Sequence, residues 1–96
     1  MDENGYPTEE ELERIRQWPY DDFMGLMKFV AEQCWWGGES GMRQRGRRFR
    51  LATGGWSGNE EVIAALSKNS MFDAMCWQSS HRGGLHIYHV PKIIKD

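Results

Sequence analysis

The chain has 96 residues, of which 12 are Lys or Arg and 14 are Asp or Glu, for a formal net charge of −2. This length predicts one domain with a modest core, and the near-neutral charge argues against the strongly basic domains that usually bind nucleic acid. No apolar stretch approaches the roughly 20 residues that cross a bilayer, so we expect no membrane segment. The cysteines are Cys34 and Cys76, without a Cys-x-x-Cys pair, which predicts free thiols in a cytoplasmic protein.

The two halves of the chain differ in charge. Residues 1–40 carry a net charge of −7, and residues 41–96 carry a net charge of +5. Either the halves pack together and neutralise each other, or the basic half binds an anionic ligand. Five tryptophans in so short a chain also indicate that some indoles line a surface or a pocket.

The first part of the chain predicts helices over residues 8–36. Residues 1–7 predict a flexible start, and Thr8 with Glu11 has the pattern of a capping box that begins a short surface helix. Pro19 interrupts the helical pattern. A second helix follows, and its apolar residues at helical spacing predict the main core face: Phe23, Leu26, Met27, Val30 and Cys34.

Residues 45–90 predict a core of strand, helix, strand and strand. Residues 38–46 are rich in glycine and arginine and predict a mobile loop, whereas residues 47–53 alternate as a strand does. Ser57 with Glu60 fits a second capping box, so we expect a helix over residues 58–68 that Asn69 closes. Residues 71–79 predict a central strand, because both of its faces are apolar. Residues 81–84 predict a hairpin turn, residues 85–90 the returning strand, and residues 91–96 a tail.

These elements predict one α+β domain with an α/β-like core. In it a small three-stranded mixed sheet, made of a strand-helix-strand unit plus a hairpin, packs with two N-terminal helices. A strand-helix-strand unit normally forms a parallel crossover, so strands 47–53 and 72–79 should end at the same edge of the sheet. The glycine turn after the first strand would then lie beside the hairpin turn, at an edge where open sheets commonly bind ligands.

We therefore expect a site for a phosphorylated, nucleotide-like compound at this edge. Helix amino ends, guanidinium groups and hydroxyls hold phosphate, and an indole stacks on a base. The expected ligand-binding residues are Arg48, Arg50, Thr53, Gly54, Gly55, Trp56, Ser57, Asn59, Trp77, Ser79, Ser80, His81 and Arg82. A site formed by two turns of a small chain is shallow, so we expect a homo-oligomer to deepen it. The sequence predicts no catalytic residue, no metal site and no cofactor.

Other classes of function fit parts of the sequence. His81 and His86 have the acid–base chemistry of a small metal-independent phosphodiesterase. Five arginines between positions 43 and 50, with Trp35 and Trp36 upstream, are of the kind that holds single-stranded nucleic acid by charge and stacking. The acidic first helix would suit a host protein as partner, although such a run of charge is usually a solvated face.

Two segments also resemble a known family. Arg50-Leu-Ala-Thr-Gly-Gly-Trp-Ser-Gly-Asn-Glu and Cys76-Trp-x-Ser-Ser-x-Arg-Gly-Gly resemble paired motifs of small proteins encoded mainly by bacteriophages. The resemblance covers roughly residues 35–90 and leaves the acidic first helix outside. It implies an anti-defence protein in the cytoplasm of an infected bacterium, of the kind that sequesters cyclic or ADP-ribose-derived nucleotides of bacterial immune signalling.

Overall fold

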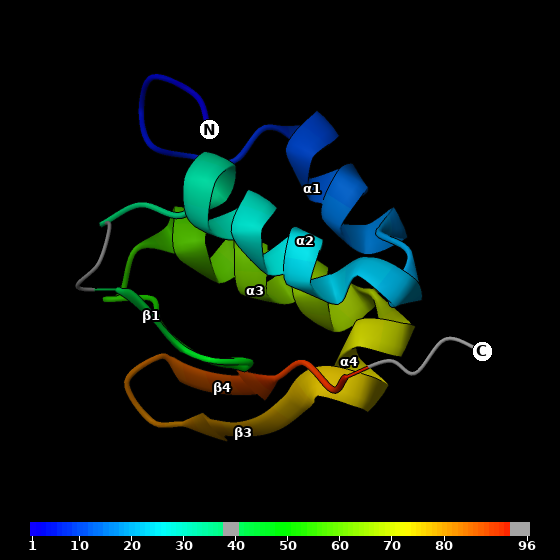
Figure 1. Ribbon diagram of the computed structural model, residues 1–96. Helices are drawn as coiled ribbons and strands as arrows, with labels where there is room; N and C mark the ends of the chain where they lie inside the picture. The colour runs from blue at the N-terminus through cyan, green and yellow to red at the C-terminus, as the bar shows by residue number, and fades with distance from the viewer. Residues whose placement is uncertain (38–40, 93–96) are drawn as a thin grey trace.

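The computed structural model of the chain describes residues 1–37 and 41–92 (Figure 1). The helices are α1 (Glu9–Gln17), the 3-10 turn η1 (Tyr20–Asp22), α2 (Phe23–Phe29), the π-helical turn η2 (Val30–Cys34), α3 (Ser57–Lys68) and α4 (Ser70–Cys76). The strands are β1 (Met42–Arg45), β2 (Arg48–Ala52), β3 (Trp77–His81) and β4 (Leu85–His89). The predicted α+β class is confirmed, with four strands in place of three. The parts of the predicted loop and tail at 38–40 and 93–96 lie outside the described residues.

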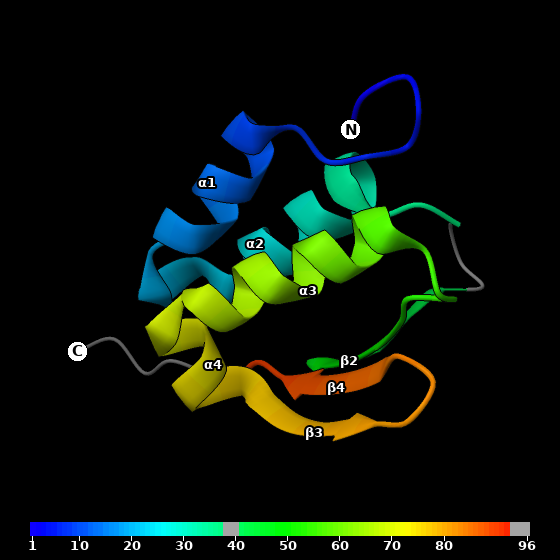
Figure 2. The ribbon, with the colours of Figure 1, turned by 180° about the vertical axis from the view of Figure 1, so that it is seen from behind.

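The strands form one sheet in the order β1-β2-β4-β3, and every neighbouring pair is antiparallel. Helices α1, α2 and α3 lie together on one side of this sheet, while α4 leads into β3 at one end (Figures 1 and 2). Within the described chain, no element covers the opposite face. β2 and β3 both run antiparallel to β4, so they point in the same direction and end at the same edge, as predicted. The expected mixed pairing is corrected, because β4 separates them.

The N-terminal helices form for the reasons that the sequence indicates. Thr8 Oγ1 accepts a hydrogen bond from Glu11 N at 3.1 Å, and Thr8 N donates to Glu11 Oε1 at 2.8 Å, which completes the capping box of α1. The apolar stripe of α2 and η2 is buried in the core cluster, together with Ile15, Trp35, Phe49, Leu51, Val62, Ile63, Ala65, Leu66, Phe72, Cys76, Tyr88 and Val90. Cys34 and Cys76 are free, and burial raises the pKa of each thiol to about 12. Both thiols therefore stay protonated and unreactive near neutral pH.

Residues 70–76 form helix α4, although the sequence predicts a strand over residues 71–79. The buried side chain of Asn69 explains the difference, because its Oδ1 accepts a hydrogen bond from Phe72 N at 3.2 Å and caps α4. Its Nδ2 donates to Ile15 O at 2.9 Å and to Trp18 O at 3.1 Å. One amide group thus fixes the start of α4 against the end of α1.

The strands differ from the prediction at two further places. Residues 42–45, expected in a mobile loop, form β1 and pair with β2. Gly46, with a φ of 61°, makes the tight turn between them, because a two-residue hairpin favours a positive φ at its first central position. β3 begins at Trp77 and is a largely exposed edge strand, so the predicted central strand is wrong. β4 takes the inner position instead.

Candidate functional site

The ends of β2 and β3 bring the two glycine turns together. Thr53 N donates a hydrogen bond to Gly84 O at 2.9 Å, and Ala52 and His81 both pair with Leu85. Gly84, with a φ of 83°, approaches so closely that a Cβ atom there would overlap the Thr53 hydroxyl. The predicted meeting of the two turns at one sheet edge is therefore confirmed.

A cavity of about 400 Å³ opens beside the first glycine turn. Its lining residues come from the segment after η2, the residue before β1, the end of β2, the turn that follows it and the first turn of α3: Trp36, Gly37, Gly41, Ala52, Thr53, Gly54, Gly55, Trp56 and Asn59. Five of the predicted ligand-binding residues thus share one cavity.

The polar side chains of this cavity are largely engaged with the protein backbone. Asn59 Oδ1 accepts a hydrogen bond from Trp36 N at 2.9 Å, and Asn59 Nδ2 donates to Trp36 O at 2.9 Å and to Thr53 O at 3.4 Å. Thr53 Oγ1 accepts from Gly55 N at 3.4 Å. Asn59 and Thr53 are both buried. They shape the cavity wall and leave little polar capacity for a ligand.

The N-terminal segment packs on the other side of this turn. The ring of Tyr6 lies 4.8 Å from that of Trp56, and Trp56 Nε1 donates to Gly5 O at 3.0 Å. The hydroxyls of Tyr6 and Ser57 are hydrogen-bonded at 2.9 Å. Trp56 is the N-cap of α3 and makes no side-chain cap bond, so the predicted capping box of Ser57 with Glu60 is wrong. Trp56 and Ser57 therefore contact the chain itself, where the sequence suggests a base and a phosphate.

The predicted residues of β3 divide between the two faces of the sheet. On the helix-covered face, Trp77 Nε1 donates to Ser80 Oγ at 2.8 Å, and Ser80 Oγ lies 2.9 Å from His86 Nδ1. Burial lowers the pKa of His86, which favours a neutral ring whose Nδ1 accepts a hydrogen bond from the Ser80 hydroxyl. On the uncovered face, Ser79 Oγ lies 2.9 Å from His81 Nε2. Arg82, also predicted in the site, is exposed in the turn between β3 and β4.

The uncovered face of the sheet carries four arginines in two directly opposed pairs. The register pairs Arg43 with Arg50 and Arg45 with Arg48. Side chains of directly paired residues in an antiparallel ladder lie on the same face. All four arginines are exposed, and the β2 residues that alternate with Arg48 and Arg50 are buried against the helices. We call Arg43, Arg45, Arg48 and Arg50 the arginine face.

Carboxylates do not neutralise the arginine face within residues 1–37 and 41–92. The ion pairs formed by these residues join the N-terminal ammonium and Arg16 to glutamates of α1, in the helical layer. Arg47, in the hairpin turn, donates instead to Val90 O at 2.7 Å and to Pro91 O at 2.9 Å. The four guanidinium groups form no ion pair with another described residue, so the face is strongly cationic although the chain is slightly acidic.

Two hollows lie on the arginine face. The larger, of about 520 Å³, is lined by all four arginines with Gln44 and Ile87, and the smaller, of about 230 Å³, is lined by Gly41, Arg43, Arg50, Ala52 and Leu85. Ile87 is only 9% exposed although it lies outside the core cluster. It therefore forms an apolar floor beneath a cationic rim.

The structure divides the predicted site and adds to it. Arg48 and Arg50 belong to the arginine face and do not line the cavity at the glycine turn, although Arg50 lines the smaller hollow together with Gly41 and Ala52, which also line that cavity. Arg43 and Arg45 are functional candidates that the predicted site omits. The sequence predicts a loop over residues 38–46, so it does not predict β1, which carries both arginines. The signal that could have found them is Gly46 in a two-residue turn between two alternating runs.

No protein-family model, curated protein or solved structure matches the chain. None of the helices in the described ranges is sufficiently long and apolar to span a membrane. Within the same ranges, no three His, Cys, Asp or Glu side chains gather in a group that could hold a metal ion. The chemistry of the site therefore rests on its own residues, chiefly the arginines.

Proposed function

We propose that the arginine face binds a phosphorylated, nucleotide-like small molecule and that the protein sequesters this ligand without altering it. The observation that carries the proposal is the direct opposition of Arg43 to Arg50 and of Arg45 to Arg48. These four exposed cations surround one hollow, and none forms an ion pair with another described residue. A bound anion would supply the missing counter-charge.

Without a ligand, the opposed arginines repel each other across the strands. Like charges on directly opposed strand residues destabilise a sheet. A phosphate between them would replace repulsion by attraction, because each guanidinium presents parallel N–H groups that match phosphate oxygens. Ile87 and Leu85 add apolar surface next to the arginines, as small-molecule sites commonly do.

A small ligand fits this face better than a strand of nucleic acid. A volume of about 520 Å³ lies within the range of roughly 300–1,000 Å³ typical of small-molecule sites. The outward positions of the strands carry no Phe, Tyr or Trp: they are Arg43, Arg45, Arg48, Arg50, Ala52, Ser79, His81, Leu85, Ile87 and His89. Sequence-tolerant binding of single strands usually depends on aromatic stacking, and the net charge of −2 also argues against it.

Sequestration extends the resemblance to phage-encoded proteins. A protein that binds a cyclic or ADP-ribose-derived nucleotide tightly would lower the free concentration of that immune signal in an infected cell. Because the hollow lies on an open sheet face, a second copy placed over it would enclose the ligand more fully. The homo-oligomer expected from the sequence therefore stays part of the proposal.

One contact favours a second candidate, hydrolysis of the ligand. Ser79 Oγ lies 2.9 Å from His81 Nε2 on the same uncovered face, which is the geometry of a nucleophile beside a base. Such pairs usually need a third group that orients the imidazole. No described side chain other than Ser79 forms a hydrogen bond with His81, and β4 separates the pair from the arginines. Binding without turnover is therefore the stronger proposal.

The test is titration calorimetry with a panel of cyclic dinucleotides, cyclic ADP-ribose isomers and ADP-ribose, followed by chromatography of the ligand recovered after heating. Intact recovery supports sequestration, and an altered product supports hydrolysis. Arg50→Ala should weaken binding strongly. Lys68→Ala, which removes the same charge from the exposed end of α3, should not. Equal affinity of wild type and Arg50→Ala would exclude the arginine face as the site.

A further inference from the structure

We propose that the free edge of β1 is a docking site for an extended peptide in which apolar side chains alternate with aspartate or glutamate. The peptide would add to the sheet as a fifth strand. This surface is the edge of β1 and the groove beside α2, and the nucleotide proposed above would lie instead in the hollow of the arginine face. Arg43 and Arg45 lie in β1 and line that hollow, and Gln44 lines both the hollow and the groove.

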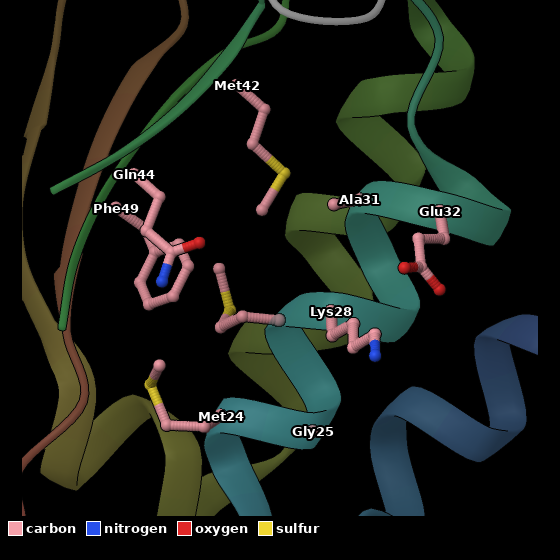
Figure 3. Close-up of a pocket in the computed structure, with 9 residues that line it drawn as sticks. Met24, Gly25, Lys28, Ala31, Glu32, Met42, Gln44 and Phe49 are labelled. Carbon is pink, nitrogen blue, oxygen red and sulfur yellow. The ribbon is translucent and has the colours of Figure 1, made fainter. Parts of the chain in front are cut away.

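An apolar groove of about 570 Å³ lies between β1 and α2. Its lining is rich in methionine: Met24, Gly25, Met27, Lys28, Ala31, Glu32, Met42, Gln44 and Phe49. Figure 3 shows Met42, Gln44 and Phe49 pointing from the strands toward α2, and Met24 pointing from α2 toward the strands. Methionine side chains are flexible, and methionine-rich surfaces adapt readily to apolar partners.

The main chain of β1 offers hydrogen bonds at this groove. β1 is the last strand of the described sheet. In a two-residue hairpin the pair that flanks the turn exchanges hydrogen bonds, and bonded and non-bonded pairs then alternate. Arg45 and Arg43 are therefore bonded to β2, and the bond from Ala52 N to Gly41 O at 2.6 Å continues the alternation. This pattern leaves the backbone N–H and C=O groups of the remaining β1 residues directed at the free edge, where another strand can pair.

The two sides of β1 require different side chains from a partner. Met42 and Gln44 face the groove, whereas Arg43 and Arg45 face the uncovered side. Side chains of an added strand alternate between these sides, so groove-side positions should be apolar and the others acidic. Acidic residues next to the arginines would form favourable cross-strand pairs. A second copy of β1 would add cations to the arginine face, and this charge argument selects an acidic peptide as the occupant.

The test uses fluorescence polarisation of a labelled, end-capped peptide of alternating leucine and glutamate, about eight residues long to match a typical strand. We expect binding to the full chain, weakened about tenfold or more when lysine replaces glutamate. Two N-methylated peptides then probe the main chain. In antiparallel pairing the leucines lie opposite Met42 and Gln44 and donate their N–H groups to β1. N-methylation of the leucines should therefore cost about tenfold or more in affinity, and N-methylation of the glutamates should not.

Gln44→Pro gives the matched change in the protein. It removes a backbone N–H that faces the free edge and spares the bonds to β2, as edge strands tolerate proline. We expect it to abolish peptide binding while thermal unfolding shows that the fold persists. Equal affinity of wild type for the two N-methylated peptides would overturn the proposal even if this variant did not fold. Unchanged peptide binding by folded Gln44→Pro would overturn it as well. If Gln44→Pro bound the peptide normally but lost nucleotide binding, the change would lie in the hollow of the arginine face, and the peptide proposal would still be overturned.

Discussion

Arg43 and Arg50 lie directly opposite each other on neighbouring strands of an uncovered sheet face. The Cβ atoms of such cross-strand pairs are roughly 4.5–5.5 Å apart, so two positively charged side chains project from neighbouring positions on the same face. The ligand-free protein therefore carries an unfavourable electrostatic contribution to its stability. The fold tolerates this contribution because the opposite side of β2 is packed in the core.

Replacing Arg50 by glutamine should therefore raise the free energy of unfolding of the ligand-free protein at low salt, by roughly 0.2–1 kcal/mol. The gain should shrink as salt increases, because exposed charges are screened. Urea unfolding at several salt concentrations measures both effects. Lys68→Gln is the charge-matched control and should show no such gain. A lower stability of Arg50→Gln at low salt would contradict repulsion between the opposed arginines.

Gly84→Ala should destabilise the protein more than Gly83→Ala. Both glycines have a positive φ, of 83° and 88°, so each substitution costs about 1–2 kcal/mol in backbone strain. A Cβ atom at Gly83 meets open space, whereas one at Gly84 overlaps the hydroxyl of Thr53, and such overpacking adds about 1–3 kcal/mol. Urea unfolding of the two variants isolates the contact between the glycine turns. Equal destabilisation would mean that this contact is absent in solution.

The helices show which parts of the fold the sequence could predict. The stripe of α2 repeats at helical spacing over several turns, so its period is unambiguous. In α4, Phe72 and Cys76 are four positions apart, which suits a helix, but with Ala74 they also alternate as a strand does. A short apolar run fits both periods. The outcome depends on Asn69, whose bond to Ile15 joins residues 54 positions apart, and no local pattern reveals such a contact.

In the candidate site too, some features could be predicted from the sequence, whereas others depend on contacts between distant residues. The meeting of Thr53 with Gly84 follows from the direction of two strands, so topology alone could predict it. From the local sequence, Trp56 and Ser57 offer an indole and a hydroxyl to a ligand. In the structure, Tyr6, 51 residues from Ser57, packs against the Trp56 ring and shares a hydrogen bond with the Ser57 hydroxyl. β1 was missed because its four residues continue a glycine-rich segment that indicates a loop, although Gly46 after them signals a turn.

Asn69→Ala should lower the free energy of unfolding by roughly 1.5–5 kcal/mol. It removes the cap of α4, worth about 0.5–2 kcal/mol, and leaves the carbonyl groups of Ile15 and Trp18 without their amide donor, at a further cost of about 1–3 kcal/mol. Asn69→Ser keeps a capping oxygen and should recover only part of the loss. Ser70→Ala, at the exposed next position, is the control. If Asn69→Ala is as stable as this control, Asn69 does not join α1 to α4.

The stability of the protein should fall as the pH drops below about 6.5, in part because of His86. Burial lowers the pKa of its ring from the ordinary value of 6.5, so the unfolded chain binds the proton more readily than the folded chain. The stability that the neutral ring contributes is complete above pH 6.5 and is lost as the pH falls toward the folded pKa. Urea unfolding at several pH values between 5 and 7 measures this effect. The unfolding free energy of His86→Asn should change less with pH than that of wild type. Gln78→Asn, which changes no titrating group, should keep the wild-type dependence of the unfolding free energy on pH. The same dependence in His86→Asn would show that His86 does not contribute to the loss of stability at low pH.

His81 distinguishes a protein that holds its ligand from one that cleaves it. Its imidazole contacts Ser79 Oγ at 2.9 Å and has no further described hydrogen-bond partner to orient it as a base. We therefore expect wild type to return a bound nucleotide intact after heating. His81→Ala should lower the affinity by less than about tenfold, because β4 separates His81 from the arginines, and it should leave recovery of the ligand unchanged. Ser79→Ala, which removes the other member of the pair, should behave in the same way. Chromatography of the ligand after long incubation gives the decisive measurement: a nucleotide consumed by wild type but spared by both variants would establish hydrolysis at Ser79 and His81 in place of sequestration.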